Sequence, residues 1–199
     1  MDPFDLVSLL LALPDGRLVS GTFQGAIELW PADGKGKSIV FGHRRGDGIT
    51  SLGVLADGRL ASGSTSGTIA LWPRDGGDKP QILSHGAAVW SLAGLADGRL
   101  ASGGGDGKIK LWPRDSAGEP EILTKGSCVR SLAVLPDGRL ASRDDEGNIK
   151  LWLVDEQKLV AALCLRAGRN ITNEEWDRYV GSGTPRPASR RDCPSNWRT

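Results

Sequence analysis

The sequence predicts an all-β fold built from four similar units, each a small antiparallel sheet. The tetrapeptide Asp-Gly-Arg-Leu recurs at 15–18, 57–60, 97–100 and 137–140. A Leu-Trp pair recurs in step with it and ends at Trp30, Trp72, Trp112 and Trp152. The first step of the repeat is 42 residues long, and the next two are 40 residues each. A repeat of this length with strand-like alternation is typical of stacked β-sheet blades.

The third unit shows the predicted strands most clearly. Residues 91–95 and 108–112 alternate apolar side chains, and 100–103 is a short apolar run between them. Asp-Gly turns separate these strands, and Asp-Gly is a strong hairpin signal because glycine adopts positive φ at little cost. A fourth strand is expected after each Leu-Trp pair, at 38–41, 81–84, 121–124 and 159–165. Because one such sheet cannot cover both its faces, we expect the units to stack face to face around an axis, as propeller blades do.

The composition of the 199-residue chain fits a globular protein of the cytoplasm. Hydrophobic residues make up 39% and charged residues 25% of the chain, and the net charge is +1. This charge gives no electrostatic reason to expect nucleic acid or a membrane as a partner. The three cysteines are odd in number and lack metal-site spacing, which favours a reducing compartment. The acidic N-terminus is unlike a secretion signal, and the apolar run 6–13 is too short to span a bilayer.

The repeated unit resembles the WD40 repeat, in the bacterial form x-S-L-A-x-L-x-D-G-R-L-A-S-G-S-x-D-G-x-I-x-L-W. The resemblance covers residues 1–165, as four blades at about 6–43, 49–85, 89–125 and 129–165. In that family a His, a Ser or Thr, an Asp and the Trp form a hydrogen-bonded set that holds each blade. The resemblance implies a full set in the third unit, from His85, Ser102, Asp106 and Trp112. It implies a partial set in the second unit, from His43, Ser62 and Trp72, where Ser66 stands in place of the Asp.

The outer units depart further from the family pattern. The first unit keeps Ser20 and Trp30, and the fourth keeps Ser142 and Trp152, but neither has the His. We therefore expect packing and turns to be the main stabilisers of three of the four blades. The combination of His, Ser and Asp in the third unit could be mistaken for a nucleophilic triad. The structural interpretation is favoured, because the family places that serine within the sheet.

Beyond Leu165 the composition changes. Thr172 and Glu175 have the spacing of a capping box, which predicts a short helix over about 173–180, followed by a Pro/Arg-rich tail. The segment 166–199 resembles the C-terminal extension of bacterial WD40 signalling proteins, in its A-G-R-N-x-T-x-E-E-W-x-R-Y run and a later Cys-Pro.

Three residues that enter the first strand of otherwise matched repeats differ in type, namely Thr50, Trp90 and Arg130. In WD40 propellers, residues at the ends of this strand face the rim where partners dock, and Trp and Arg are enriched at interaction hot spots. We therefore identify these three as the candidate partner-binding rim. The alternative is that Trp90 packs between blades.

The number of units bears on function. Four blades are fewer than the seven or eight with which this family usually closes a ring, and the first unit begins with its own first strand near Val7. The leading hypothesis is a non-enzymatic protein-interaction module without a cofactor, in which two chains associate through blade faces to complete an eight-bladed ring. Completion of the ring by another polypeptide and a four-bladed or open monomer are the alternative assemblies. A second hypothesis is a sensor fragment of a larger bacterial signalling ATPase or effector. A third, an enzyme built on the propeller, has only two histidines to draw on.

Overall fold

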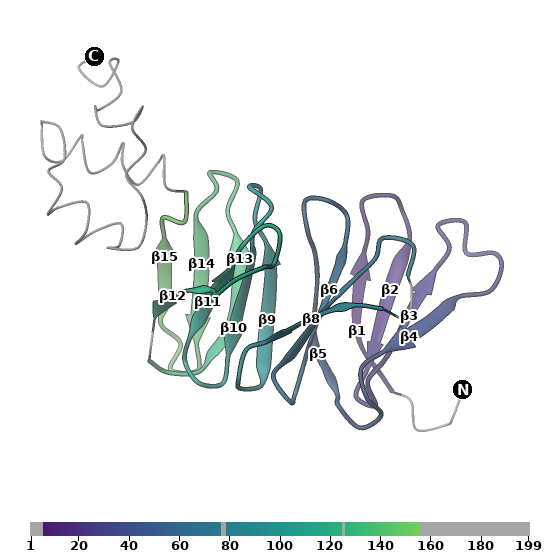
Figure 1. Ribbon diagram of the computed structural model, residues 1–199, viewed down its shortest axis with the longest axis horizontal. Helices are drawn as coiled ribbons and strands as arrows, with labels where there is room; N and C mark the ends of the chain where they lie inside the picture. Colours follow the sequence, from purple (N-terminus) through teal and green to yellow (C-terminus); the bar gives the residue numbers. More distant parts are fainter. Residues whose placement is uncertain (1–5, 77–78, 125, 156–199) are drawn as a thin grey trace, which may run out of the picture. The chain divides into compact units, whose positions relative to one another are not determined.

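The structure is a computed structural model that describes residues 6–76, 79–124 and 126–155 (Figure 1). Within these residues it contains fifteen β-strands and no helix. The chain divides into two compact units, 1–135 with 141–150, and 136–140 with 151–199. The strand expected at 159–165 and the helix expected at 173–180 lie outside the described residues.

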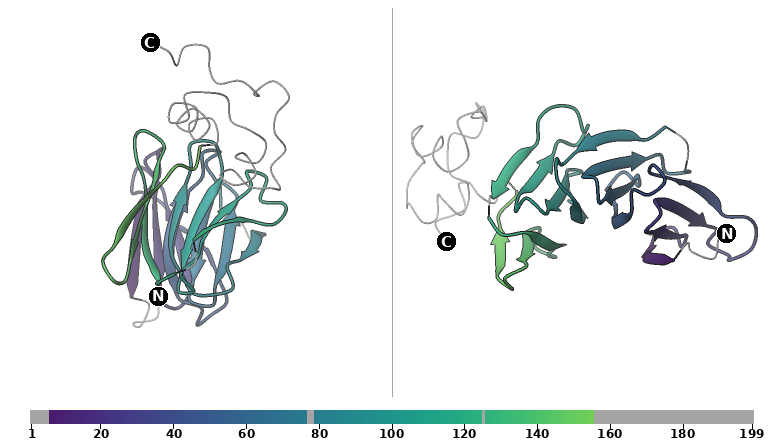
Figure 2. Two further views of the ribbon diagram at one scale, coloured as in Figure 1. Left: turned by 90° about the vertical axis from the view of Figure 1, so that its left-hand side faces the viewer. Right: turned by 90° about the horizontal axis from the view of Figure 1, so that it is seen from below.

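The strands form separate antiparallel sheets, each made from consecutive segments of the chain (Figure 2). The first sheet contains β1 (Val7–Ala12), β2 (Leu18–Thr22), β3 (Ala26–Trp30) and β4 (Ile39–Gly42). The second contains β5 (Ile49–Val54), β6 (Leu60–Ser64), β7 (Thr68–Trp72) and β8 (Gln81–Ser84). The third contains β9 (Val89–Gly94), β10 (Leu100–Gly104), β11 (Ile109–Trp112) and β12 (Glu121–Thr124). The fourth contains β13 (Val129–Val134), β14 (Leu140–Asp144) and β15 (Ile149–Trp152) among the described residues.

The Asp-Gly-Arg turns are built in the same way in every sheet. In the second sheet, Gly58 has a φ of +85°, and the Asp57 carboxylate accepts hydrogen bonds from the backbone N–H and the Nε of Arg59, at 3.0 and 2.8 Å. The guanidinium of Arg59 also reaches the third sheet, where Nη2 donates to the carbonyl of Arg114 at 3.4 Å. In the first two units the turn therefore closes a hairpin and also bonds to the next unit, since Arg17 in the same way donates to the carbonyl of Arg74.

The core lies between successive sheets, as the stacking prediction requires. Each inner sheet has a front face, which meets the preceding sheet, and a rear face, which meets the following one. Ile27 on the rear face of the first sheet and Leu60 and Trp72 on the front face of the second belong to one buried cluster. Ile69 and Leu100 occupy matching places in the cluster between the second and third sheets. We call each such contact of a rear face with a front face a junction.

Candidate functional site

The third sheet carries the complete polar set. The hydroxyl of Ser102 lies 2.9 Å from Nδ1 of His85 and accepts a hydrogen bond from the indole Nε1 of Trp112 at 2.8 Å. On the other side of the imidazole, Nε2 of His85 lies 3.2 Å from Oδ1 of Asp106. These partners fit a neutral imidazole with its proton on Nε2. The structure therefore brings together the four residues at which the WD40 set was expected.

The electrostatics of this set favour a structural role. Burial lowers the pKa of His85, and the opposing attraction of the Asp106 carboxylate does not outweigh it. Burial alone would raise the pKa of Asp106, but hydrogen bonds from Lys108 and contact with His85 hold it below its usual value. Ser102 is fully buried, and its oxygen already accepts the Trp112 indole. A serine in this position cannot present a nucleophile to a substrate.

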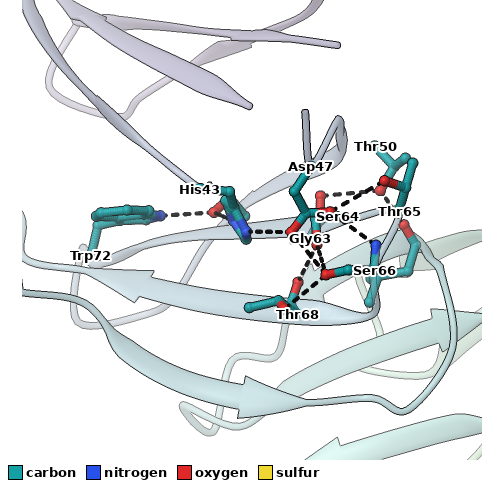
Figure 3. A network of polar contacts seen from close by, with 11 residues as sticks. His43, Asp47, Thr50, Gly63, Ser64, Thr65, Ser66, Thr68 and Trp72 are labelled. Carbon is teal, nitrogen blue, oxygen red and sulfur yellow. Dashed lines mark hydrogen bonds and ion pairs between the residues drawn. The ribbon is translucent and has the colours of Figure 1, made fainter. Parts of the chain in front are cut away.

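The second sheet holds a similar set, but its carboxylate comes from the loop that precedes the sheet and not from the turn between its second and third strands. Nε2 of His43 lies 2.7 Å from the hydroxyl of Ser62, which also accepts Nε1 of Trp72 at 2.7 Å. The carboxylate near this histidine belongs to Asp47, whose Oδ2 lies 3.6 Å from Nδ1 of His43 (Figure 3). Asp47 also accepts hydrogen bonds from the backbone N–H and the hydroxyl of Ser66, at 2.9 and 2.8 Å. The second sheet therefore has a carboxylate beside its histidine, supplied by a residue outside the expected set.

Asp47 is a residue that sequence reasoning missed. It lies in the loop 43–48, which is two residues longer than the matching loop in the third unit and accounts for the first repeat step of 42 residues. Burial alone would raise the pKa of Asp47, but the hydrogen bonds from Ser66 and its neighbours hold it below its usual value. The longer step was the only sequence signal that the loop carries something extra.

The outer sheets have smaller sets. In the first sheet, Nε1 of Trp30 donates to the hydroxyl of Ser20 at 3.1 Å. In the fourth sheet, Ser142 lies on β14 and Trp152 on β15.

A groove of about 920 Å³ opens between the first and second sheets. Its walls include Phe41, Thr68 and Ala70. At the position of Ala70, the third sheet has Lys110, whose Nζ donates to the carbonyl of His85 at 2.8 Å and lies 5.7 Å from the ring centre of Trp112. Ala70 is too short to fill the space that the side chain of Lys110 occupies at the next junction, and the groove opens at this place.

The three rim candidates lie at two different junctions. The Thr50 hydroxyl, which has one proton to donate, lies within hydrogen-bond distance of two carbonyls, that of Gly63 at 3.0 Å and that of Val89 in the third sheet. The Arg130 guanidinium lies 4.9 Å from the ring centre of Trp90, which joins the third and fourth sheets by a cation–π contact. Arg130 is exposed and Trp90 half-buried. The structure thus brings Trp90 and Arg130 together and engages Thr50 elsewhere; their partner-binding role stays a prediction.

The described residues give no sign of a metal site or a membrane span. Across 6–76, 79–124 and 126–155, no three His, Cys, Asp or Glu side chains gather in a way that could hold a metal ion. In the same part of the chain, no helix has the length and apolarity needed to cross a bilayer.

Comparison with known proteins identifies the repeat. The model of the WD domain, G-beta repeat family matches residues 35–73 and 77–113. The computationally designed Ika4 protein is a similar solved structure, with 25% identity and a TM-score of 0.62, over 76% of this chain and 92% of that one. The RRP9 WD40 repeats are another, with 20% identity and a TM-score of 0.68, over 76% of this chain and 49% of that one. No curated protein sequence matches.

These findings fix the kind of repeat and the fold. The described part of the chain spans about half the length of the RRP9 WD40 structure that it resembles. WD40 repeat domains are generally non-catalytic modules that bind other proteins. The chain contains WD40 repeats, at 35–73 and 77–113, in an all-β fold of WD40 type.

Proposed function

We propose that this chain is a non-enzymatic protein-interaction module that associates with a second copy of itself through its two open sheet faces. The observation that supports this is the exposure of residues at matched positions. Leu60 and Leu100, on the front faces of the second and third sheets, are 5% and 1% exposed, whereas Leu18, at the same position in the first sheet, is 47% exposed. The front face of the first sheet is thus an apolar surface without the cover that its repeats have.

The rear face of the fourth sheet shows the same contrast. Ile27, Ile69 and Ile109 are fully buried, because each lies on a rear face that a following sheet covers. Ile149, at the matching position of the fourth sheet, is 71% exposed. Within residues 6–155, as far as the structure describes them, one front face and one rear face of matching chemistry are therefore exposed.

A second copy is the partner that fits both faces. Every junction within the chain joins a rear face to a front face. The rear face of one copy and the front face of another therefore have the same kinds of residues as the junctions inside the chain. Two such junctions close a pair of chains, and a heterologous contact that closes in this way gives a finite assembly. The matched part of this chain covers 49% of the RRP9 WD40 chain, so two copies together would have about the length of that WD40 structure.

The second hypothesis, a sensor or regulatory fragment of a larger bacterial signalling protein, rests on the same exposed front face. There the first sheet would be covered by further blades of the longer polypeptide. In either case we propose a cytoplasmic setting and assign the Trp90–Arg130 pair as a candidate contact for a protein partner, because both side chains belong to hot-spot types.

The experiment is to measure the solution mass of two face variants by light scattering after size exclusion. Leu18→Glu and Ile149→Glu each place a charge on an open face, and we expect each to reduce association because an unpaired charge is costly to bury. The matched control is Ile122→Glu, which changes an isoleucine that is 53% exposed on an inner sheet. Association that survives both face variants would contradict the proposal. A chain that remains monomeric, but associates with added blades, would favour the second hypothesis.

A further inference from the structure

A glycine on the rear face of each inner junction makes room for the following sheet. These residues are Gly21, Gly63 and Gly103, on β2, β6 and β10. A Cβ built at Gly63 would lie 2.6 Å from Val89, and one at Gly103 would lie 2.5 Å from Val129. At Gly21 the corresponding distance to Ile49 is 3.1 Å. The junctions are therefore packed so closely that a methyl group at this position meets the next sheet.

The fourth sheet breaks this rule. Its second strand reads Leu-Ala-Ser-Arg at 140–143, where the third sheet reads Leu-Ala-Ser-Gly at 100–103. Gly103 pairs with Ile109 across the third sheet, so the repeat sets Arg143 beside Ile149 on the open rear face. Arg143 is exposed. A long, positively charged side chain thus stands where the inner sheets have only the hydrogen of glycine.

The residue that would meet Arg143 in a second copy is Val7. It occupies the position of Ile49 and Val89 in the strand pairing, since all three pair with the end of the neighbouring second strand. Ile49 and Val89 are fully buried, whereas Val7 is 45% exposed. A junction between copies with the inner geometry would press Val7 against the Cβ of Arg143. It would also require the guanidinium to leave the interface or to give up its water, and desolvation of a charged group is costly.

We propose that Arg143 is the residue that keeps the junction between two copies weak and reversible. The inference rests on the proposed self-association and names the residue that sets its strength. Arg143 acts at the interface in two ways, through the volume of its Cβ and stem and through its charge. The inner junctions, which have glycine at this position, are permanent parts of the fold, whereas the junction between two copies can dissociate.

The test is sedimentation velocity on the full chain and three variants, to obtain the dissociation constant of the pair. Arg143→Gly restores the inner-junction residue, and we expect it to tighten association about tenfold or more, since each factor of ten is about 1.4 kcal/mol. Arg143→Ala removes the charge but keeps the Cβ, so we expect a much smaller gain. Adding Val7→Ala to Arg143→Ala makes room for that Cβ and should recover part of the difference.

The control is Lys150→Gly, which introduces a glycine into β15, the strand that follows β14, and thermal melting of each variant checks that it folds. If the unaltered chain associates but Arg143→Gly is no tighter than the lysine control, the inference about Arg143 is overturned and the proposed self-association stands. If neither the unaltered chain nor Arg143→Gly associates at any concentration, both are overturned. An equal gain for Arg143→Ala and Arg143→Gly would overturn the role given to the Cβ.

Discussion

The inner junctions and the two end faces of this chain have apolar residues at the same repeat positions, but these residues are buried at the junctions and exposed at the ends. Between the second and third sheets, Ile69 and Leu100 are buried against each other's sheet, whereas at the ends Ile149 and Leu18 face solvent. The apolar pattern is thus repeated in all four units, whereas among the described residues the matched positions are buried at the inner faces and exposed at the two ends. The difference shows that each repeat has apolar faces that become buried only when another sheet packs against them, as expected of solenoid and propeller units.

The largest expected effect comes from truncating the same residue at an inner and an outer position. Ile109→Ala removes a fully buried side chain, and we expect it to lower the free energy of unfolding by about 3 kcal/mol. Ile149→Ala, at the exposed matching position, should cost less than about 1 kcal/mol in the monomer. Urea unfolding at low protein concentration measures both, and equal costs would break the comparison.

The space at the inner junctions gives the next effect. Gly103→Ala places a Cβ against Val129, and we expect a loss of about 1–3 kcal/mol from overpacking. Its matched counterpart is Arg143→Ala, which should leave the stability of the monomer nearly unchanged because that face is open. Thermal or urea unfolding of the two variants side by side checks this. Tolerance of Gly103→Ala would remove the physical basis for the role of Arg143.

The polar set at the first junction depends on a loop residue. Asp47→Ala removes the acceptor of the Ser66 and Thr65 hydrogen bonds, and we expect a loss of about 1–2 kcal/mol. The control is Asp33→Ala, since the carboxylate of Asp33 accepts one exposed hydrogen bond, from the N–H of Lys35. If both variants unfold at the same urea concentration, Asp47 does not replace the missing Asp of the second sheet.

The two buried histidines make the junctions sensitive to acid. The pKa values of His43 and His85 are lowered chiefly by burial, so the unfolded chain takes up protons first as the pH falls through about 6.5. Stability is therefore full above that pH and falls below it. We expect the Tm to drop between pH 7.5 and 5.5, to a smaller extent in His85→Gln. A Tm that rises over this range would contradict the burial of the neutral imidazoles.

The smallest effect concerns a turn. Ser116 has a φ of +55°, and its buried hydroxyl has no hydrogen-bond partner among the described residues. The matching turn residues Gly34 and Gly76 have φ values of +65° and +77°. Ser116→Gly should therefore stabilise the chain, by about 0.5–1 kcal/mol, because it relieves both the backbone conformation and the unpaired hydroxyl. A lower Tm for this variant would show that the hydroxyl is satisfied by solvent.

Much of the fold could be predicted because its signals are local. The Asp-Gly turns and the alternation between them fixed the strands in sequence, and 81–84 and 121–124 are the observed bounds of β8 and β12. The predicted strand at 108–112 begins one residue later, at Ile109, and the backbone N–H of Lys108 donates to the turn residue Asp106. Elsewhere, too, the differences in strand limits are confined to the ends.

The site was harder to predict, because its contacts join different repeats. Asp47 takes the place of a carboxylate that is missing from another turn, at Ser66, and no local sequence pattern indicates such an exchange. Likewise, the bond from Thr50 to the carbonyl of Val89 depends on how two sheets meet. Comparison of aligned repeats showed that Trp90 and Arg130 differ from their counterparts, and only the three-dimensional structure shows that these two side chains contact each other.

The most direct test of the central claim is the solution mass of the unaltered chain, measured by light scattering over a dilution series. One chain has a mass of 21.1 kDa. If the open faces join two copies through a weakened junction, the mass will rise with concentration from this value towards twice this value and stop there. A mass that stays at 21.1 kDa at every concentration, or that grows without limit, would contradict the closed two-chain assembly.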